Sequence, residues 1–272
     1  MFEIKPTKGW RFFNLRELWA YRELLYFLIW RGVKVRYKQT TIGIAWAVLQ
    51  PLAMMLVFTA FFGRLAKIPS QGIPYPLFVL AGLIPWQFFL RTFTESSSSL
   101  IADQRLITKV YFPRIIIPLA TTIVASLDFF ISVCLLIIFM VIYGIMPAPS
   151  VIALPIFLLL LLVSVLGFGF WFSALNVEYR DVGYVVPFLG QLLFFLTPVV
   201  YPTDMVPSQL RGLHALNPMV GVVGGFRYAF YGVGDGFSIA FVISSISAFI
   251  IFLTGILWFT RVEHTFVDTI GS

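Results

Sequence analysis

The sequence predicts an all-α protein that crosses a lipid bilayer several times. Five stretches contain no Asp, Glu, Lys or Arg, namely 39–63, 68–90, 129–177, 182–203 and 236–260. A membrane-spanning helix needs only about 20 apolar residues. The composition agrees, because 60% of the residues are hydrophobic, 11% are charged and the mean hydropathy is +0.94. A water-soluble fold of this size could not bury so much apolar surface.

The chain of 272 residues has little room for a separate soluble domain beside several spans. We expect a cytoplasmic interfacial arm with a basic run at 1–38 and a six-span transmembrane domain at 39–272. The first forty residues carry charges and tryptophans and lack a compact apolar segment followed by a small-residue cleavage site. We therefore expect no signal peptide and a cytoplasmic N-terminus.

The arm is expected to contain an amphipathic helix that lies in the membrane interface. Asn14 and Glu17 have the spacing of a capping box and predict a helix over 15–30. Its apolar residues fall on one side, and Trp10, Trp19 and Trp30 suit the headgroup region. A passive anchor and a docking surface for another protein are equally compatible with this pattern.

A basic run follows the arm and consists of Arg31, Lys34, Arg36 and Lys38. Four positive charges next to a span can hold anionic lipid headgroups or a lipid-linked phosphate. General headgroup attraction and the setting of topology are the more common roles of such a run.

The six expected spans are 40–63, 74–93, 114–143, 151–175, 184–201 and 238–259. Lys and Arg divide between the two sides of this arrangement as fifteen against four. The positive-inside rule therefore predicts that both termini are cytoplasmic.

The segment 202–237 is nominally an external loop, yet it contains an uncharged stretch interrupted by Asn217 and Pro218. Short apolar helices are tolerated at membrane depth where protein buries them or where they line a cavity. We expect a re-entrant pair of helices near the outer face. The alternative is a loop that lies on the membrane surface.

The sequence gives no pattern typical of an enzyme. His214 and His264 are 50 residues apart without a metal-binding spacing, and the chain has no phosphate-binding Gly-x-x-x-x-Gly-Lys loop. An intramembrane glycosyl or acyl transferase would show clustered acids or histidines, and none occurs. We expect no metal and no cofactor on this chain, so ATP and magnesium, if used, would belong to a partner subunit.

Asp128 is the ionisable side chain expected deep inside a span. Such residues mark functional sites by default. A structural role is favoured here, with hydrogen bonds to Ser126 or to a neighbouring helix, because one acid is weak support for a proton pathway. A secondary transporter or channel usually has more than one buried ionisable residue.

Aromatic residues make up 18% of the chain, and many occur within the expected spans. They include Trp46, Phe58, Phe62, Trp86, Phe89, Phe93, Phe194 and Phe195, with Tyr201 just after the fifth span. Aromatic faces offer sugar rings a flat apolar contact, but ordinary packing and interface belts explain most such residues.

Two cytoplasmic segments are suited to contact with another protein. The segment 95–114 contains a serine run and a short amphipathic pattern, with Asp103, Arg105 and Lys109 expected to be exposed. The shorter segment 176–181 places both signs of charge in one turn. Either segment can also be a solvated loop, which is the usual fate of a charge run.

Five motifs together resemble the permease subunits of ABC exporters for bacterial polysaccharides, the group that exports O-antigen, capsule and teichoic acid. They lie at 30–51, 111–114, 176–181, 197–202 and 216–227, in the order and spacing of that family. The resemblance covers nearly the whole chain. One departure is Gly32, where the family commonly has an acidic residue, and this puts in doubt any polar contact that the acid would make.

The resemblance implies a homodimer in the bacterial inner membrane, with two ABC ATPase subunits on the cytoplasmic face and a lipid-linked polysaccharide as substrate. It implies no nucleic-acid partner. The dimer interface would form the conduit, lined by the aromatic residues named above. Coupling to the ATPase is expected from Ser98, Asp103, Arg105, Thr108, Glu178, Tyr179, Arg180 and Asp181. The outer gate is expected from Asn217, Pro218, Gly225 and Arg227. An ABC permease for a small lipid or drug is the alternative that shares this architecture.

Overall fold

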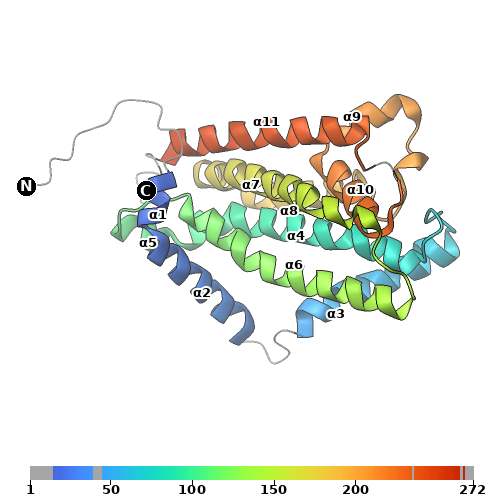
Figure 1. Cartoon of the computed structure of the whole chain (residues 1–272). Helices are drawn as coiled ribbons and strands as arrows, with labels where there is room; N and C mark the ends of the chain where they lie inside the picture. Colours follow the sequence, from blue (N-terminus) through green and yellow to red (C-terminus); the bar gives the residue numbers. More distant parts are fainter. Residues whose placement is uncertain (1–14, 39–44, 235, 264–265, 267–272) are drawn as a thin grey trace, which may run out of the picture.

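The computed structural model describes residues 15–38, 45–234, 236–263 and 266 (Figure 1). Over these residues the chain is helical and contains no strand. The helices are α1 Leu15–Ala20, α2 Arg22–Lys38, α3 Ala45–Phe58, η1 Thr59–Leu65, α4 Tyr75–Ala102, α5 Gln104–Lys109, α6 Ile116–Ile142, η2 Pro149–Ala153, α7 Leu154–Glu178, α8 Val182–Phe195, η3 Thr203–Met205, η4 Ser208–Leu210, α9 Arg211–Ala215, α10 Pro218–Tyr231 and α11 Ile239–Val262.

Five helical segments among the described residues are long and apolar enough to span a membrane, and they run lengthwise through the molecule (Figure 1). They are Ala45–Leu65, Tyr75–Ala102, Ile116–Ile142, Pro149–Glu178 and Ile239–Val262. Each overlaps one of the expected spans. The chain is therefore a multi-pass membrane protein, as the hydropathy predicts.

The remaining expected span, 184–201, is shorter in the structure. The helix α8 has 14 residues, which corresponds to about 21 Å at 1.5 Å per residue. Turns and bends follow from Leu196. Two residues explain the short helix, since Pro187 lies inside it and Pro198 follows it. Length and composition alone thus support five crossings, not the six that we expected.

The second span extends further than the sequence suggests. Expected at 74–93, it continues as one helix to Ala102 and includes the serine run that we assigned to a cytoplasmic loop. Ser96, Ser97 and Ser99 are buried, and each hydroxyl lies within hydrogen-bond distance of an oxygen on another residue. Hydroxyls that are satisfied in this way lie inside a bundle at little cost.

The helix α4 lies at the centre of the bundle. In its most apolar window 78% of the residues are buried, compared with 11% for α3 and η1 and 17% for α11. It packs against α6 on one side and α7 on the other, and α7 in turn packs against α11. The short helix α10 packs against α4, α7 and α11 at one end of the bundle (Figure 1).

The arm differs from the expected helix over 15–30. The structure has a short α1, a turn at Tyr21, and then α2, which continues through the basic run to Lys38. Figure 1 shows α2 lying obliquely beside α6. Gly32 permits this approach, because a Cβ there would lie 2.8 Å from a methyl group of Val124 on α6. Asn14, Trp10 and the side chain of Glu17 lie outside the described part, as does the expected start of the first span at 40–44.

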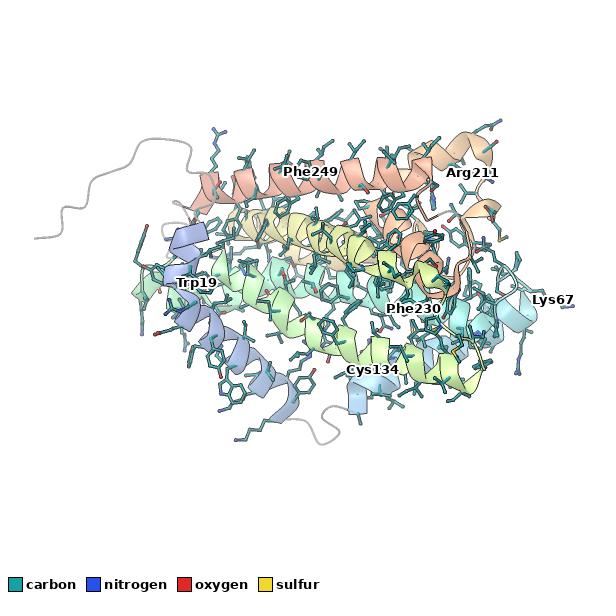
Figure 2. All side chains as sticks on the ribbon, viewed as in Figure 1. Trp19, Lys67, Cys134, Arg211, Phe230 and Phe249 are labelled. Atoms are coloured by element: carbon teal, nitrogen blue, oxygen red, sulfur yellow. The ribbon has the colours of Figure 1, made fainter. Side chains whose placement is uncertain are left out.

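The bundle has two distinct ends. One end carries α1, α5 and the last turns of α4, α7 and α11, and Trp19 lies there (Figures 1 and 2). The opposite end carries α9, α10 and the loops around Lys67 and Arg211 (Figure 2). We call these the α5 end and the α10 end.

Candidate functional site

The two segments expected to contact a partner lie together at the α5 end. The amide of Asn176 near the end of α7 donates to the carbonyl oxygen of Ser97 in the last turns of α4 at 2.8 Å. This bond holds the helix that leads into α5 beside the helix that leads into residues 178–181. All four of the latter, Glu178, Tyr179, Arg180 and Asp181, are exposed. These residues and α5 thus present exposed charges of both signs at the same end of the bundle.

The residues between 98 and 108 that we expected to couple to a partner have different surroundings. Arg105 and Thr108 lie on α5 and are exposed. Ser98 is also exposed, but it belongs to α4. Asp103 is less exposed than we expected, because its carboxylate forms an ion pair with Arg31 of α2 at 2.5 Å. The structure therefore places Asp103 at a joint between the arm and the bundle.

The basic run does not form one open cationic face. Arg31 is paired with Asp103, and Arg36 points inward to Asp128, with 2.6 Å between Nη2 and Oδ2. Lys34 lies over the ring of Trp30, 4.9 Å from its centroid, and Lys38 is exposed. Two of the four cations are thus available to lipid or phosphate, whereas Arg31 and Arg36 hold the arm to the bundle.

Asp128 is the centre of a charged cluster that joins three helices. Its carboxylate accepts hydrogen bonds from Tyr37 of α2 and Arg91 of α4, and it pairs with Arg36 of α2. Glu95 completes the cluster, accepting from Arg91 Nε at 2.9 Å and lying 3.6 Å from Arg36 Nη1. The neighbouring-helix partner that we expected is confirmed. The Ser126 partner is wrong, because that hydroxyl donates to the carbonyl of Ile123.

The charges of this cluster balance. Two arginines face two carboxylates, which is the arrangement that lets ionised groups persist inside a protein. Burial raises the pKa of Tyr37, and its hydrogen bond to Asp128 raises the pKa further. The phenol therefore stays protonated, and its O–H donates a hydrogen bond to the carboxylate of Asp128.

Sequence reasoning missed Arg91 and Glu95 as members of a site. We placed the end of the second span at 93, with Arg91 in its last turn and Glu95 at the start of a cytoplasmic segment. Their spacing of four with opposite charges was the available signal, because such a pair stabilises a continuing helix.

Three of the aromatic residues expected to line a channel are buried within the chain. Trp86 is 2% exposed, and Phe89 and Phe93 are fully buried. The rings of Phe89 and Phe93 contact each other and two rings of α7, Phe168 and Phe172, with centroids 4.9–5.8 Å apart. The ring of Trp86 contacts Phe89 and Phe194 of α8, each with centroids 5.5 Å apart. This corrects the expectation, since these side chains fill the interfaces of α4 with α7 and α8.

The other expected aromatics lie on α3, η1, α8 and the turn after α8. Trp46 is 56% exposed and Phe195 is 65% exposed. Phe58 and Phe194 stack on each other with centroids 5.7 Å apart and bring α3 and α8 together. The half-buried Phe62 packs edge-on against Phe58. The half-buried Tyr201 lies in the turn after α8, and its hydroxyl donates to the carbonyl oxygen of Phe195.

The expected outer-gate residues belong to a helical pair, α9 and α10. Asn217 caps α10, because its side-chain oxygen accepts from the backbone N–H of Met219 at 3.0 Å, and Pro218 occupies the first helical position. Gly225 allows α10 to touch α7, since a Cβ there would lie 2.0 Å from the ring of Phe157.

Arg227 fixes α10 to its neighbours. It is 3% exposed and lies over the ring of Phe78, 3.5 Å from the centroid. Its guanidinium donates to three carbonyl oxygens, those of Val199 at 2.6 Å and of Phe78 and Tyr201 at 3.3 Å. A cation in this position connects α10, α4 and the segment after α8.

Comparison with protein families gives one match that covers most of the chain. The family model described as ABC-2 type transporter matches residues 23–231. This range includes α2, the charged cluster, both segments of the α5 end and the whole of α10.

Individual relatives have consistent names. The O-antigen export system permease protein RfbA of Myxococcus xanthus is 35% identical over 221 residues, which cover 80% of this chain and 84% of that protein. A protein of the same name from Klebsiella pneumoniae is 29% identical over 247 residues, 90% of this chain and 94% of that protein. The polysialic acid transport protein KpsM of Escherichia coli is 28% identical over 201 residues, 72% of this chain and 76% of that protein.

Proposed function

The chain belongs to the ABC-2 type transporter family, and we propose that it is the channel-forming membrane subunit of an ATP-driven exporter of a lipid-linked polysaccharide. The observation that carries this proposal is the near full-length similarity to permeases named for O-antigen export. The chain itself is a transporter subunit and does not catalyse a reaction. The substrate class follows from the relatives, whose names specify O-antigen and polysialic acid.

The proposed location is the cytoplasmic membrane of a bacterium, with the α5 end in the cytoplasm. The excess of Lys and Arg on that side supports this orientation. We propose that α8 and the turns at 196–201 together make the sixth crossing, so that both termini are cytoplasmic. In this arrangement α9 and α10 form a re-entrant pair at the outer face.

We assign the α5 end to the contact with two ABC ATPase subunits. The exposed Arg105, Thr108 and the charged residues at 178–181 supply the polar rim expected at such an interface. ATP and magnesium would bind to the partner. Asn176 joins α7 to α4, so we propose that a displacement of α5 or of residues 178–181 by the ATPase moves both helices.

A homodimer is proposed, in which two copies face each other through α3 and α8. Only two residues of each of these helices are buried, and the exposed aromatic side chains of α3, of η1 after it and of α8 include Trp46, Phe61, Phe188 and Phe195. Flat apolar rings suit a polysaccharide that must slide, because they hold a sugar ring without directional hydrogen bonds. The proposed lining aromatics are therefore Trp46, Phe58, Phe62, Phe194, Phe195 and Tyr201.

The remaining residues have proposed supporting roles. Lys34 and Lys38 contact lipid headgroups or the phosphate of the substrate, and the α1 and α2 arm lies beside the ATPase in the interface. At the outer face, the helical pair held by Asn217, Gly225 and Arg227 acts as the gate.

Deletion of the gene in its native host tests the function. We expect loss of the polysaccharide from the cell surface and accumulation of the lipid-linked glycan inside, and both effects should be reversed by the wild-type chain. A normal amount of surface glycan in the deletion strain, with no accumulation inside, would contradict the assignment.

A further inference from the structure

The two halves of α2 are attached to the bundle in different ways. In the first half, Leu24, Leu25 and Ile29 pack around the buried Leu28, against the second apolar cluster of the molecule. After Gly32, no described residue of α2 belongs to either buried apolar cluster. The first half is therefore fixed by apolar packing and the second half is not.

The second half is held by charged groups instead. Arg31 pairs with Asp103, Arg36 pairs with Asp128, and Tyr37 donates to Asp128. The Arg31 side chain is 45% exposed, so water can replace its carboxylate partner readily. The Arg36 and Asp128 side chains are only 14% and 13% exposed, so their pair breaks only when water enters the space beneath α2.

A cavity of about 300 Å³ lies directly under this half of α2. Its walls carry charged and polar side chains, namely Arg31, Arg36, Arg91, Glu95, Asp103 and Thr121. A second cavity of about 360 Å³ lies between α3, α4 and α6 and is lined by Gln50, Gln87, Asp128 and Ser132. Arg91 and Glu95 line both cavities.

We infer that the second half of α2, residues 31–38, is a lid that opens during transport. It pivots on the packed Leu28 and Ile29, and opening breaks the contacts of Arg36 and Tyr37 with Asp128. The two cavities then join along Arg91 and Glu95 into one crevice, whose walls carry these charged groups among apolar side chains such as Leu28, Ile84 and Phe129. The crevice extends from the α5 end to the middle of α6, where Asp128 lies. The requirement for opening during transport rests on the proposed function, whereas the lid motion itself does not.

A disulfide that locks the lid provides the first test. An ideal Cβ on Gly32 lies 3.7 Å from Cβ of Val124, within the range for a disulfide, and replacing Val124 removes the methyl group that crowds the position. We would combine Gly32→Cys and Val124→Cys in a Cys134→Ala background, since Cys134 is the single native cysteine.

The double-cysteine variant should fold and insert normally, and oxidation should lower its rate of glycan export at least ten-fold. Reduction should restore export, and each single cysteine variant should export in both conditions. Full export by a chain shown to be cross-linked would overturn the proposal.

A second test measures the lid without transport. In the purified chain, a cysteine introduced as Thr121→Cys lies in the cavity wall, and its labelling by a water-soluble maleimide reports opening. Adding Arg36→Gln should raise the labelling rate several-fold, because it removes the two ion pairs, with Asp128 and Glu95, that close the lid. The matched control is Arg22→Gln in the first half, whose guanidinium contacts Trp19 and no acid among the described residues, and it should leave the rate unchanged.

Equal labelling rates in the Arg36→Gln and Arg22→Gln variants would overturn the proposal that residues 31–38 form a lid. If no variant exports glycan, including the unmodified chain with its ATPase, the proposed function fails while the labelling result stands. The two failures are therefore distinguishable.

Discussion

The two ends of the bundle are held together by different kinds of contact. At the α10 end, side chains bond to main-chain carbonyl oxygens on distant segments: Tyr75 to Val200 at 2.7 Å, Ser150 to Tyr228 at 2.6 Å and Arg227 to Val199 at 2.6 Å. From the α5 end to mid-bundle, the arm is attached by pairs of oppositely charged side chains, Arg31 with Asp103 and Arg36 with Asp128.

This difference indicates which end can move. The buried guanidinium of Arg227 has no water to replace a lost carbonyl acceptor, so the α10 end resists rearrangement. The Arg31 side chain is 45% exposed and can exchange Asp103 for water at small cost, whereas the mostly buried Arg36–Asp128 pair does so only when water reaches it. We expect the α10 end to move as one body and the α5 end to contain the separately moving parts.

Replacement of a buried aromatic ring in the core should have the largest effect on the free energy of unfolding, against which the changes at the two ends can be compared. Phe93→Ala removes a fully buried ring between α4 and α7 and should lower the free energy of unfolding by about 4 kcal/mol. The matched change Phe195→Ala, at a side chain 65% exposed, should cost about 0.5 kcal/mol or less. Thermal unfolding in detergent compares the two variants. Equal losses in the free energy of unfolding would contradict the burial of Phe93 and support its earlier assignment to the channel lining.

The α10 end should be the less tolerant of the two ends. Gly225→Val forces a Cβ to within 2.0 Å of Phe157 and should destabilise the chain by about 3 kcal/mol. Gly224→Ala is the control, because its Cβ meets nothing within 4 Å, and it should be neutral or stabilising by up to about 1 kcal/mol. If both variants melt like the wild type, α10 is not packed tightly against α7.

The charged cluster should have an intermediate effect. Asp128→Asn leaves Arg36 and Arg91 without their shared carboxylate and should cost about 2 kcal/mol, less than a fully buried pair because Arg91 is 38% exposed. Asp103→Asn breaks only the pair with the more exposed Arg31 and should cost about 1 kcal/mol or less. A larger loss in Asp103→Asn than in Asp128→Asn would reverse this ranking.

The smallest effect on stability is expected at the coupling surface. Glu178→Gln, Arg180→Gln and Asp181→Asn combined should change the free energy of unfolding by about 0.5 kcal/mol or less, because all three residues are exposed. We expect ATP hydrolysis to continue while glycan export falls at least ten-fold. Unchanged export by the folded triple variant would remove this segment from the coupling role.

Hydropathy and charge predict most of the fold but not its helix ends. The apolar runs locate the bundle because a spanning helix is defined by length and composition. They misplace the end of α4, since Ser97, Arg91 and Glu95 read as polar although protein partners satisfy them inside the bundle. They also overestimate α8, whose helix is ended by turns around Pro198 rather than by a loss of apolar residues.

The candidate site was predictable only in part. The segments 103–109 and 176–181 are visible as charge patterns between apolar runs. The partners of Asp128 are not, because Arg36, Tyr37 and Arg91 come from two other helices whose packing no local pattern specifies. The burial of Phe93 likewise depends on α7 and that of Trp86 on α8, and both helices lie far along the sequence.

The central claim is that this chain works with an ATPase to export a glycan. The most direct measurement is purification of the tagged chain from its native membrane, followed by mass spectrometry of the bound proteins and an ATPase assay. We predict a stoichiometric nucleotide-binding subunit whose hydrolysis is stimulated by lipid-linked glycan. A chain that purifies alone, without ATPase activity, would contradict the account.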